Sequence, residues 1–233
     1  LEFRRVLFRS ASGVTIDLNG FELAGVSGSI DGIRSSIVGG FQNLAVFNGS
    51  VRNWGGTGVN FFNCNNARVE RVRAIANNAF GIRVALAGSI ADCSVANNGS
   101  GGLFASDCSL VANCCACFNL ADGIIAASNC AIVNCSATLN TGDGINAESN
   151  CTISDCVAIS NGANGITTAS SCRISGCAAN GNQSFGISVT TSSLVTGCTA
   201  ASNGSHGISL SSNNMIIGNV CAANGVSTTG SGI

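Results

Sequence analysis

The chain has 233 residues with a formal net charge of −1, and it contains 31 glycines, 14 cysteines, no proline and no tyrosine. This length is ample for one domain with a continuous core, and the near-neutral charge excludes a general electrostatic attraction to nucleic acid or to an anionic membrane. No apolar run approaches the roughly 18 residues of a membrane span. The abundance of Ser, Thr, Asn, Val and Ile favours short strands joined by tight turns.

The first ten residues, LEFRRVLFRS, resemble the conceptual translation of a sequencing adapter. We therefore expect residues 1–10 to be non-native and residues 11–233 to form a single domain. The last pair, Gly232-Ile233, matches the start of a further repeat. We expect the natural protein to continue beyond both ends of this chain.

A repeat of 21 residues runs through most of the chain. Each repeat contains a Gly followed by a hydrophobic residue, a Cys twelve positions after that Gly, and an Asn five positions after the Cys. The Gly pairs begin at Gly81, Gly102, Gly123, Gly144, Gly165, Gly186 and Gly207. The Cys column is Cys93, Cys114, Cys135, Cys156, Cys177 and Cys198, and the Asn column is Asn98, Asn119, Asn140, Asn161, Asn182, Asn203 and Asn224. Columns in one phase are typical of coils that stack on one another.

Each repeat contains short stretches that alternate apolar and polar residues, separated by Gly, Ser, Asn and Asp. This pattern predicts three brief strands per coil and no helix of useful length. Residues that point inward then form columns of like on like, and the Asn column is expected to pass side-chain hydrogen bonds from coil to coil. The glycine before each hydrophobic residue fits either a positive φ or a close backbone approach. The predicted fold is an all-β, single-stranded parallel β-helix.

Two stretches add a family resemblance to this pattern. Residues 14–21 (VTIDLNGF) are similar to the entry motif of the right-handed parallel β-helix repeat family, the pectate-lyase-like superfamily, and residues 48–52 (NGSVR) resemble its next coil. The resemblance implies a right-handed helix, a secreted or cell-surface location and a polysaccharide partner. Because the family includes lyases, hydrolases, epimerases and non-catalytic surface proteins, it does not imply one activity.

The cysteines admit three interpretations. Six occupy one inward column, and Cys130, Cys151 and Cys172 occupy a second, which favours stacked free thiols acting as small apolar residues. Some disulfides between coils are the first alternative, although parallel Cβ vectors suit them poorly. A zinc site made of Cys108, Cys114, Cys115 and Cys117 is the second, but it lacks paired CxxC motifs, and Cys115 is expected to point outward.

No catalytic constellation is evident in the sequence. Glycoside hydrolysis in this fold needs two carboxylates that converge on one outer face, and the ten acidic residues beyond residue 10 are scattered. Asp122 and Asp143 fall on consecutive coils, where they are either solvated turn residues or the ligands of a shared calcium ion. We expect no other cofactor. The single histidine, His206, occupies a turn column and is interpreted as turn variation.

An uneven distribution of arginine marks the N-terminal coils. Of the seven arginines beyond residue 10, six lie between residues 34 and 83. Alternation places Arg68, Glu70 and Arg73 outward, with Arg52 on the preceding coil, and Trp54 is a candidate aromatic ring beside them. Guanidinium groups next to an aromatic ring suit an acidic polysaccharide. The alternative is that the arginines solubilise the surface while the aromatic residues, which include Phe61 and Phe62, close the end of the helix.

Two functional hypotheses follow. The first is an extracellular module that acts as a rigid scaffold and binds an acidic polysaccharide at the Arg52, Arg68 and Arg73 face. The second is a polysaccharide lyase, hydrolase or epimerase. The scarcity of clustered acid and base groups favours the first hypothesis.

Overall fold

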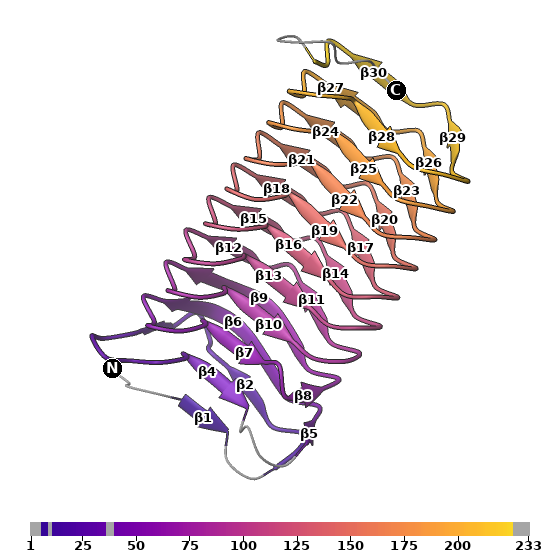
Figure 1. The fold of residues 1–233 in the computed structure, drawn as a ribbon. Coiled ribbons are helices and arrows are strands. Elements are labelled where there is room, and N and C mark those ends of the chain that lie inside the picture. Colours follow the sequence, from indigo (N-terminus) through magenta and orange to yellow (C-terminus); the bar gives the residue numbers. More distant parts are fainter. Residues whose placement is uncertain (1–5, 9–10, 36–39, 226–233) are drawn as a thin grey trace.

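The computed structural model describes residues 6–8, 11–35 and 40–225, and every regular element in this part of the chain is a β-strand. The strands stack as about nine coils of a parallel solenoid, with the first and last described strands at opposite ends of the stack (Figure 1). The predicted fold class is therefore confirmed. The origin of residues 1–10 stays a prediction, although β1 (Val6–Phe8) pairs in parallel with β4 (Ile33–Ser35).

The first face is a ten-stranded parallel sheet. Its strands, in order along the stack, are β1, β4, β7 (Val59–Phe61), β10 (Ile82–Val84), β13 (Leu103–Ala105), β16 (Ile124–Ala126), β19 (Ile145–Ala147), β22 (Ile166–Thr168), β25 (Ile187–Val189) and β28 (Ile208–Leu210). In the three-residue strands of this face from β7 to β22, the two outer side chains are buried and the middle one points outward.

The second and third faces belong to one continuous sheet, bent between them. In two coils a single long strand crosses the bend, namely β6 (Ala45–Arg52) and β9 (Arg68–Ile75). The second face also contains β2 (Thr15–Asp17), β11 (Ser89–Ala91), β14 (Leu110–Ala112), β17 (Ala131–Val133), β20 (Thr152–Ser154), β23 (Arg173–Ser175), β26 (Leu194–Thr196) and β29 (Met215–Ile217). The third face also contains β3 (Glu22–Ala24), β12 (Ser94–Ala96), β15 (Cys115–Cys117), β18 (Ser136–Thr138), β21 (Val157–Ile159), β24 (Ala178–Asn180), β27 (Thr199–Ala201) and β30 (Val220–Ala222). A separate two-stranded sheet joins β5 (Phe41–Gln42) to β8 (Cys64–Asn65).

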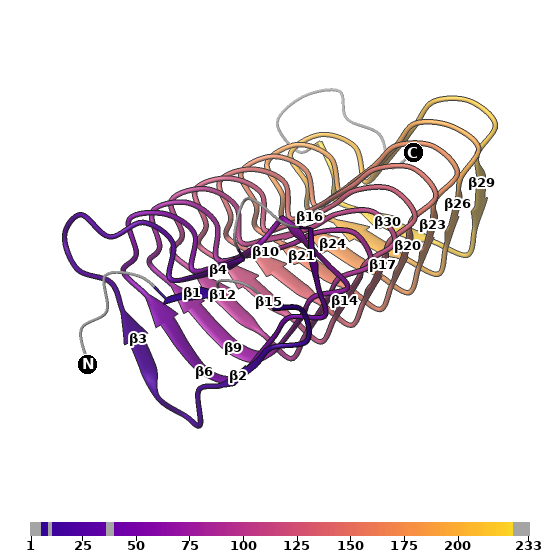
Figure 2. The same cartoon turned by 90° about the horizontal axis from the view of Figure 1, so that it is seen from below.

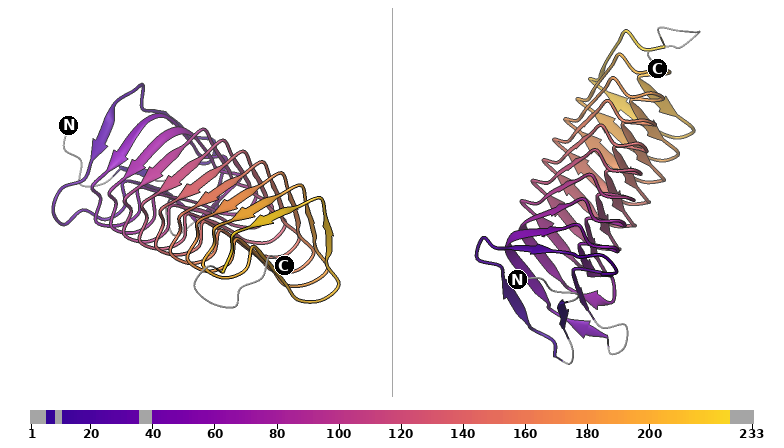
Figure 3. Two further views of the ribbon diagram at one scale, coloured as in Figure 1. Left: turned by 90° about the horizontal axis from the view of Figure 1, so that it is seen from above. Right: turned by 90° about the vertical axis from the view of Figure 1, so that its left-hand side faces the viewer.

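Views from above and from the side show the coils following one another in register along the stack (Figure 3). The first face buries two columns of side chains, and the second and third faces bury one each. The first face contributes Ile124 and Ala126, the second contributes Ile and Val such as Ile132, and the third contributes mainly alanines such as Ala137, all fully buried. The small alanines oppose the larger side chains, so the narrow interior is filled. No helix among the described residues is long and apolar enough to cross a bilayer.

Three sharp corners close each coil, and each uses a residue with positive φ. In the coil that starts at β16 these residues are Asn129 (61°), Asn134 (51°) and Leu139 (56°). Asn tolerates this conformation best among non-glycine residues, and other residues pay roughly 1–2 kcal/mol. The corner columns therefore hold many Asn residues, but the repeating stack also imposes the conformation on Leu139.

The residue after each corner provides a buried acceptor for the coil before it. In the same coil these residues are Cys130, Cys135 and Asn140, and each accepts the backbone N–H of its own column in the preceding coil, at 3.4, 3.5 and 3.1 Å. The Asn ladder is thus confirmed, and the two Cys columns occupy equivalent places at the other corners. One Cys column ends at Asn219. Its amide oxygen accepts the Cys198 N–H at 2.8 Å, in place of the thiol sulfur that accepts the equivalent N–H in earlier coils.

The repeated glycines are required by a close backbone approach. A Cβ at Gly144 would lie 2.6 Å from the Asn161 amide nitrogen and 2.6 Å from the Gly165 carbonyl oxygen. None of the seven repeated glycines has a positive φ, so of the two expectations for them the close approach is correct.

Candidate functional site

The arginine-rich face lies on β6 and β9, at the bend between the second and third faces. Seen from below, β3, β6, β9 and β12 lie side by side at the N-terminal end of the stack (Figure 2). Parallel register aligns Arg68 with Ala45 and Arg73 with Ser50. Because Val69 and Val72 are fully buried, the arginines at alternate positions point outward. We call the outer surface formed by Phe47, Ser50, Arg52, Arg68, Arg71 and Arg73 the arginine face.

Glu70 is the electrostatic centre of the arginine face. Its carboxylate pairs with Arg68 at 2.5 Å and also with Arg71. Its side chain is only 11% exposed, whereas that of Arg68 is 60% exposed. Glu70 therefore points outward as predicted, but the two arginines cover it. It orients guanidinium groups and does not itself present a free carboxylate.

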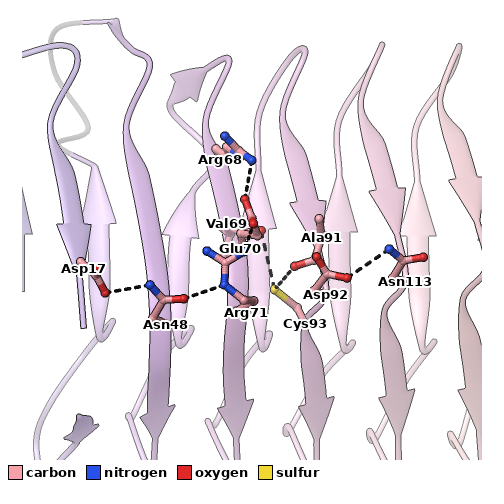
Figure 4. A network of polar contacts seen from close by, with 10 residues as sticks. All are labelled: Asp17, Asn48, Arg68, Val69, Glu70, Arg71, Ala91, Asp92, Cys93 and Asn113. Carbon is pink, nitrogen blue, oxygen red and sulfur yellow. Dashed lines mark hydrogen bonds and ion pairs between the residues drawn. The ribbon is translucent and has the colours of Figure 1, made fainter. Parts of the chain in front are cut away.

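A ladder of polar side chains continues this network along the bend (Figure 4). Arg71 Nε donates to Asn48 Oδ1 at 2.6 Å, and Asn48 Nδ2 donates to Asp17 Oδ1 at 3.0 Å. The Asn19 backbone N–H also donates to Asp17, and together these hydrogen bonds hold the pKa of Asp17 below its usual value. On the next coils, Asn113 Nδ2 donates to Asp92 Oδ1 at 3.1 Å.

The other two predicted arginines are held differently. Arg52 pairs with Glu22 at 2.7 Å, and this hydrogen bond lowers the pKa of Glu22. Arg73 Nε donates to Ser50 Oγ at 3.2 Å, and no ion pair involves Arg73 among the described residues. Exposed ion pairs of this kind contribute roughly 0–1 kcal/mol each. A competing carboxylate can therefore replace Glu22 at little cost.

A surface hollow of about 410 Å³ adjoins Arg68. Its lining includes Phe47, Arg68, Asn43, Asn66 and Ser89. The Arg68 guanidinium carbon lies 5.4 Å from the centre of the Phe47 ring, within the range of a cation–π contact. The hollow thus combines an aromatic ring, a cation and two amide side chains, a combination suited to a sugar that carries a carboxylate.

The expectation that Trp54 offers an exposed ring is wrong. Trp54 is 1% exposed, and its Nε1 donates to the Leu23 carbonyl at 3.1 Å inside the first coils. Phe61 is also fully buried, while Phe62 is 41% exposed. A buried ring can fill the wide N-terminal coils but cannot stack on a ligand. Phe47, which the sequence reasoning missed, is the aromatic residue beside Arg68.

The candidate calcium pair is engaged in turn contacts. Asp122 accepts the Asp143 backbone N–H at 2.8 Å and the Asn146 side-chain amide at 3.0 Å, and Asp143 accepts the Asn164 N–H at 2.8 Å. Each carboxylate therefore faces donors on the following coil. Within residues 11–35 and 40–225, no group of three or more His, Cys, Asp or Glu is placed to hold a metal ion. His206 contacts Ser205 and the Phe185 ring.

All fourteen cysteines are free thiols in the structure. The six of the first predicted column and the three of the second are buried, as expected. Cys114 points inward and Cys115 outward, so the four cysteines of the zinc interpretation do not converge on one point.

A second cationic cluster, on the first face, was missed by the sequence reasoning. The Arg83 guanidinium lies 4.2 Å from the Phe62 ring centre, 5.0 Å from Phe80 and 5.3 Å from Phe104. Burial lowers the pKa of Arg83, and its Nε is buried without a hydrogen-bond partner in the described part of the chain. The sequence signal for this cluster was that Arg83 and Phe104 are the middle, outward-pointing residues of β10 and β13 and are aligned on adjacent coils.

Comparisons with known proteins agree with this architecture. A family model described as "right handed beta helix region" matches residues 31–193. Comparison with curated protein sequences finds no match. Among solved structures, the chain is similar to the A-module of mannuronan C-5 epimerase AlgE6 from Azotobacter vinelandii, with 16% identity and a TM-score of 0.78, covering 98% of this chain and 75% of that one.

Two further structures extend the comparison. One is a double mutant of the periplasmic alginate epimerase AlgG, with 16% identity and a TM-score of 0.73, covering 95% of this chain and 63% of that one. The other is pectate lyase Pel9A, with 17% identity and a TM-score of 0.51, covering 97% and 71%. At these identities the likeness concerns the fold. The family match covers more than half of the residues, and the chain belongs to the right-handed β-helix family.

Proposed function

We propose that this protein is an extracellular β-helix module that binds an acidic, uronate-containing polysaccharide along the arginine face. The observation that carries the proposal is the exposed Arg68 guanidinium above Phe47, at the rim of the hollow, with Arg73 exposed on the same strand. Similar folds in proteins named for mannuronan, alginate and pectate support a polyuronate as the partner. The periplasmic relative supports a location outside the cytoplasm.

The geometry fits an extended polymer better than a small ligand. Neighbouring coils are about 4.8 Å apart, and the outward arginines occupy two adjacent coils, Arg52 on β6 and Arg68 and Arg73 on β9. Guanidinium groups form paired hydrogen bonds with carboxylates, so successive uronates can engage successive arginines. Arg52 and Arg68 already have carboxylate partners, so the polymer must compete with Glu22 and Glu70. Modest affinity with a marked salt dependence follows.

A matched pair of variants tests the proposed site. Arg173 occupies the same column as Arg68, five coils along the stack, and is exposed. We expect Arg68→Ala combined with Arg73→Ala to weaken binding of uronate oligomers at least tenfold in low salt, while Arg173→Ala changes it less than twofold. Titration calorimetry in low and high salt, with a neutral oligosaccharide as control, gives the measurement. Uronate binding that is unchanged by the double substitution and by the salt concentration would refute the proposed site.

The second candidate is a polysaccharide-modifying enzyme, supported by the epimerases and the lyase among the similar structures. It needs an acid or base beside the sugar, and the two carboxylates in contact with the arginine face are both paired: Glu22 with Arg52, and Glu70 with Arg68 and Arg71. Incubation of the protein with polyuronates separates the candidates. New reducing ends, unsaturated products or C-5 epimerised residues would establish the enzyme, whereas binding with an unchanged polymer supports the module.

A further inference from the structure

Two thiols stand apart from the buried cysteine columns. Cys115 and Cys117 are the first and last residues of β15, on the outer side of the third face, while Ala116 between them is fully buried. Cys115 is exposed and Cys117 is half-buried. Neither sulfur donates a hydrogen bond to a backbone carbonyl of the described residues, whereas the buried thiol of Cys114 lies 3.2 Å from the Ala112 carbonyl oxygen. These two thiols are therefore available to a ligand.

The neighbouring coil shows how close such a pair of side chains comes. Parallel register aligns Cys115 with Ser136 and Cys117 with Thr138. The hydroxyl oxygens of Ser136 and Thr138 are 3.3 Å apart. On β18 the first and last side chains thus lean toward each other until their γ-oxygens are in contact. Cys115 and Cys117 occupy the equivalent backbone positions on β15, so the same side-chain directions would bring the two sulfurs together.

This geometry disfavours a disulfide within the strand. Residues two apart on a strand are separated by about 6.6 Å, with Cβ atoms nearly parallel, whereas a disulfide needs Cβ atoms about 3.8 Å apart. A metal ion spans a wider gap. With metal–thiolate bonds of about 2.3 Å, two sulfurs on opposite sides of one ion lie about 4.6 Å apart, a separation that side-chain rotation can reach from backbone positions about 6.6 Å apart.

We propose that Cys115 and Cys117 form a two-thiolate binding site for a soft monovalent metal ion, Cu(I). Thiolates select soft ions, and a pair of thiolates completes the coordination that Cu(I) accepts. A structural zinc ion needs four ligands, and the described residues offer no third His, Cys, Asp or Glu beside this pair. The proposal is independent of polysaccharide binding, because the pair lies two coils beyond Arg73 in the same column.

The repeats themselves supply conservative variants for the test. Cys115→Ser introduces the residue that Ser94 and Ser136 provide in the same column, and Cys117→Thr introduces that of Thr138. Cys108→Ser is the matched control, because Cys108 is an exposed thiol at a positive-φ corner whose column holds serine in later coils. All three variants should fold.

The experiment is an anaerobic titration of reduced protein with Cu(I) against a chromophoric Cu(I) chelator. We expect the wild type and Cys108→Ser to retain one Cu(I) that competes with the chelator, and either β15 variant to bind it at least 100-fold more weakly. Mass spectrometry after thiol alkylation should show that Cu(I) protects Cys115 and Cys117. Equal Cu(I) binding by the wild type and both β15 variants would overturn the proposal, as would a Cys115–Cys117 disulfide in the air-oxidised protein.

Discussion

Replacing Asn140 by alanine removes four side-chain hydrogen bonds from the interior of the stack. Its Oδ1 accepts from the backbone nitrogen and the side-chain amide of Asn119, at 3.1 and 2.9 Å. Its Nδ2 donates to the Ala116 carbonyl and to Asn161 Oδ1, at 3.0 and 3.1 Å. Asn140 is 2% exposed, so water cannot replace these partners. At about 1 kcal/mol for each hydrogen bond, we expect Asn140→Ala to lower the free energy of unfolding by about 4 kcal/mol.

Urea unfolding followed by circular dichroism measures this loss, and Asn129→Ala is the matched control. Asn129 is exposed at a positive-φ corner whose column also holds Ala87, so its substitution should cost about 1–2 kcal/mol, well below the loss at Asn140. Because long repeat arrays depart from two-state unfolding, hydrogen exchange should localise the effect to the coils on either side of Asn140. Equal losses from the two variants would refute the claim that the Asn ladder stabilises the stack.

Three further predictions concern other parts of the stack. Gly144→Ala should lower the free energy of unfolding in urea by about 1–3 kcal/mol, because the new Cβ would lie 2.6 Å from a backbone carbonyl oxygen of the next coil. Gly197→Asn, at a corner with open space, is the control. Equal losses from the two variants would contradict the predicted steric clash at Gly144. Glu70→Gln should tighten uronate binding several-fold at low salt, because it releases two arginines; weaker binding in titration calorimetry would show that Glu70 does not compete with the polymer. The pKa values of Asp17 and Glu22 lie below 3.8 and 4.5 respectively, so the stability that these groups contribute is present above about pH 4.5 and is lost as the pH falls through their folded values. Hydrogen-exchange protection of residues 15–24 should therefore fall in acid before that of the central coils, and uniform protection down to pH 2 would contradict this.

The periodic part of the fold was predictable from sequence because one geometric rule repeats. Gly144, Cys135 and Asn140 each represent a column at a fixed offset, and a constant coil length keeps every member in the same environment. The three corners were not predicted as equivalent because their side chains differ. Only the structure shows that Cys135 and Asn140 both accept an N–H from the coil before.

The candidate site was less predictable because the first coils do not keep the regular spacing between aligned residues that the later coils have. Paired residues are 26 positions apart from β4 to β7 and 23 apart from β7 to β10, so Trp54 has no column that would assign it to the interior. Alternation correctly placed Glu70 outward, but spacing does not describe how far the long side chains of Arg68 and Arg71 reach to cover it. The ring cluster around Arg83 likewise depends on side chains from successive coils.

Hydrogen exchange with and without a saturating uronate oligomer tests polysaccharide binding at the arginine face most directly. The oligomer should slow exchange in peptides that cover residues 45–52 and 68–75, which contain β6 and β9, and it should leave residues 152–159 and 173–180 unchanged. A neutral oligosaccharide of equal length should protect neither region. Protection confined to the first face, or to the later coils, would contradict the proposed site.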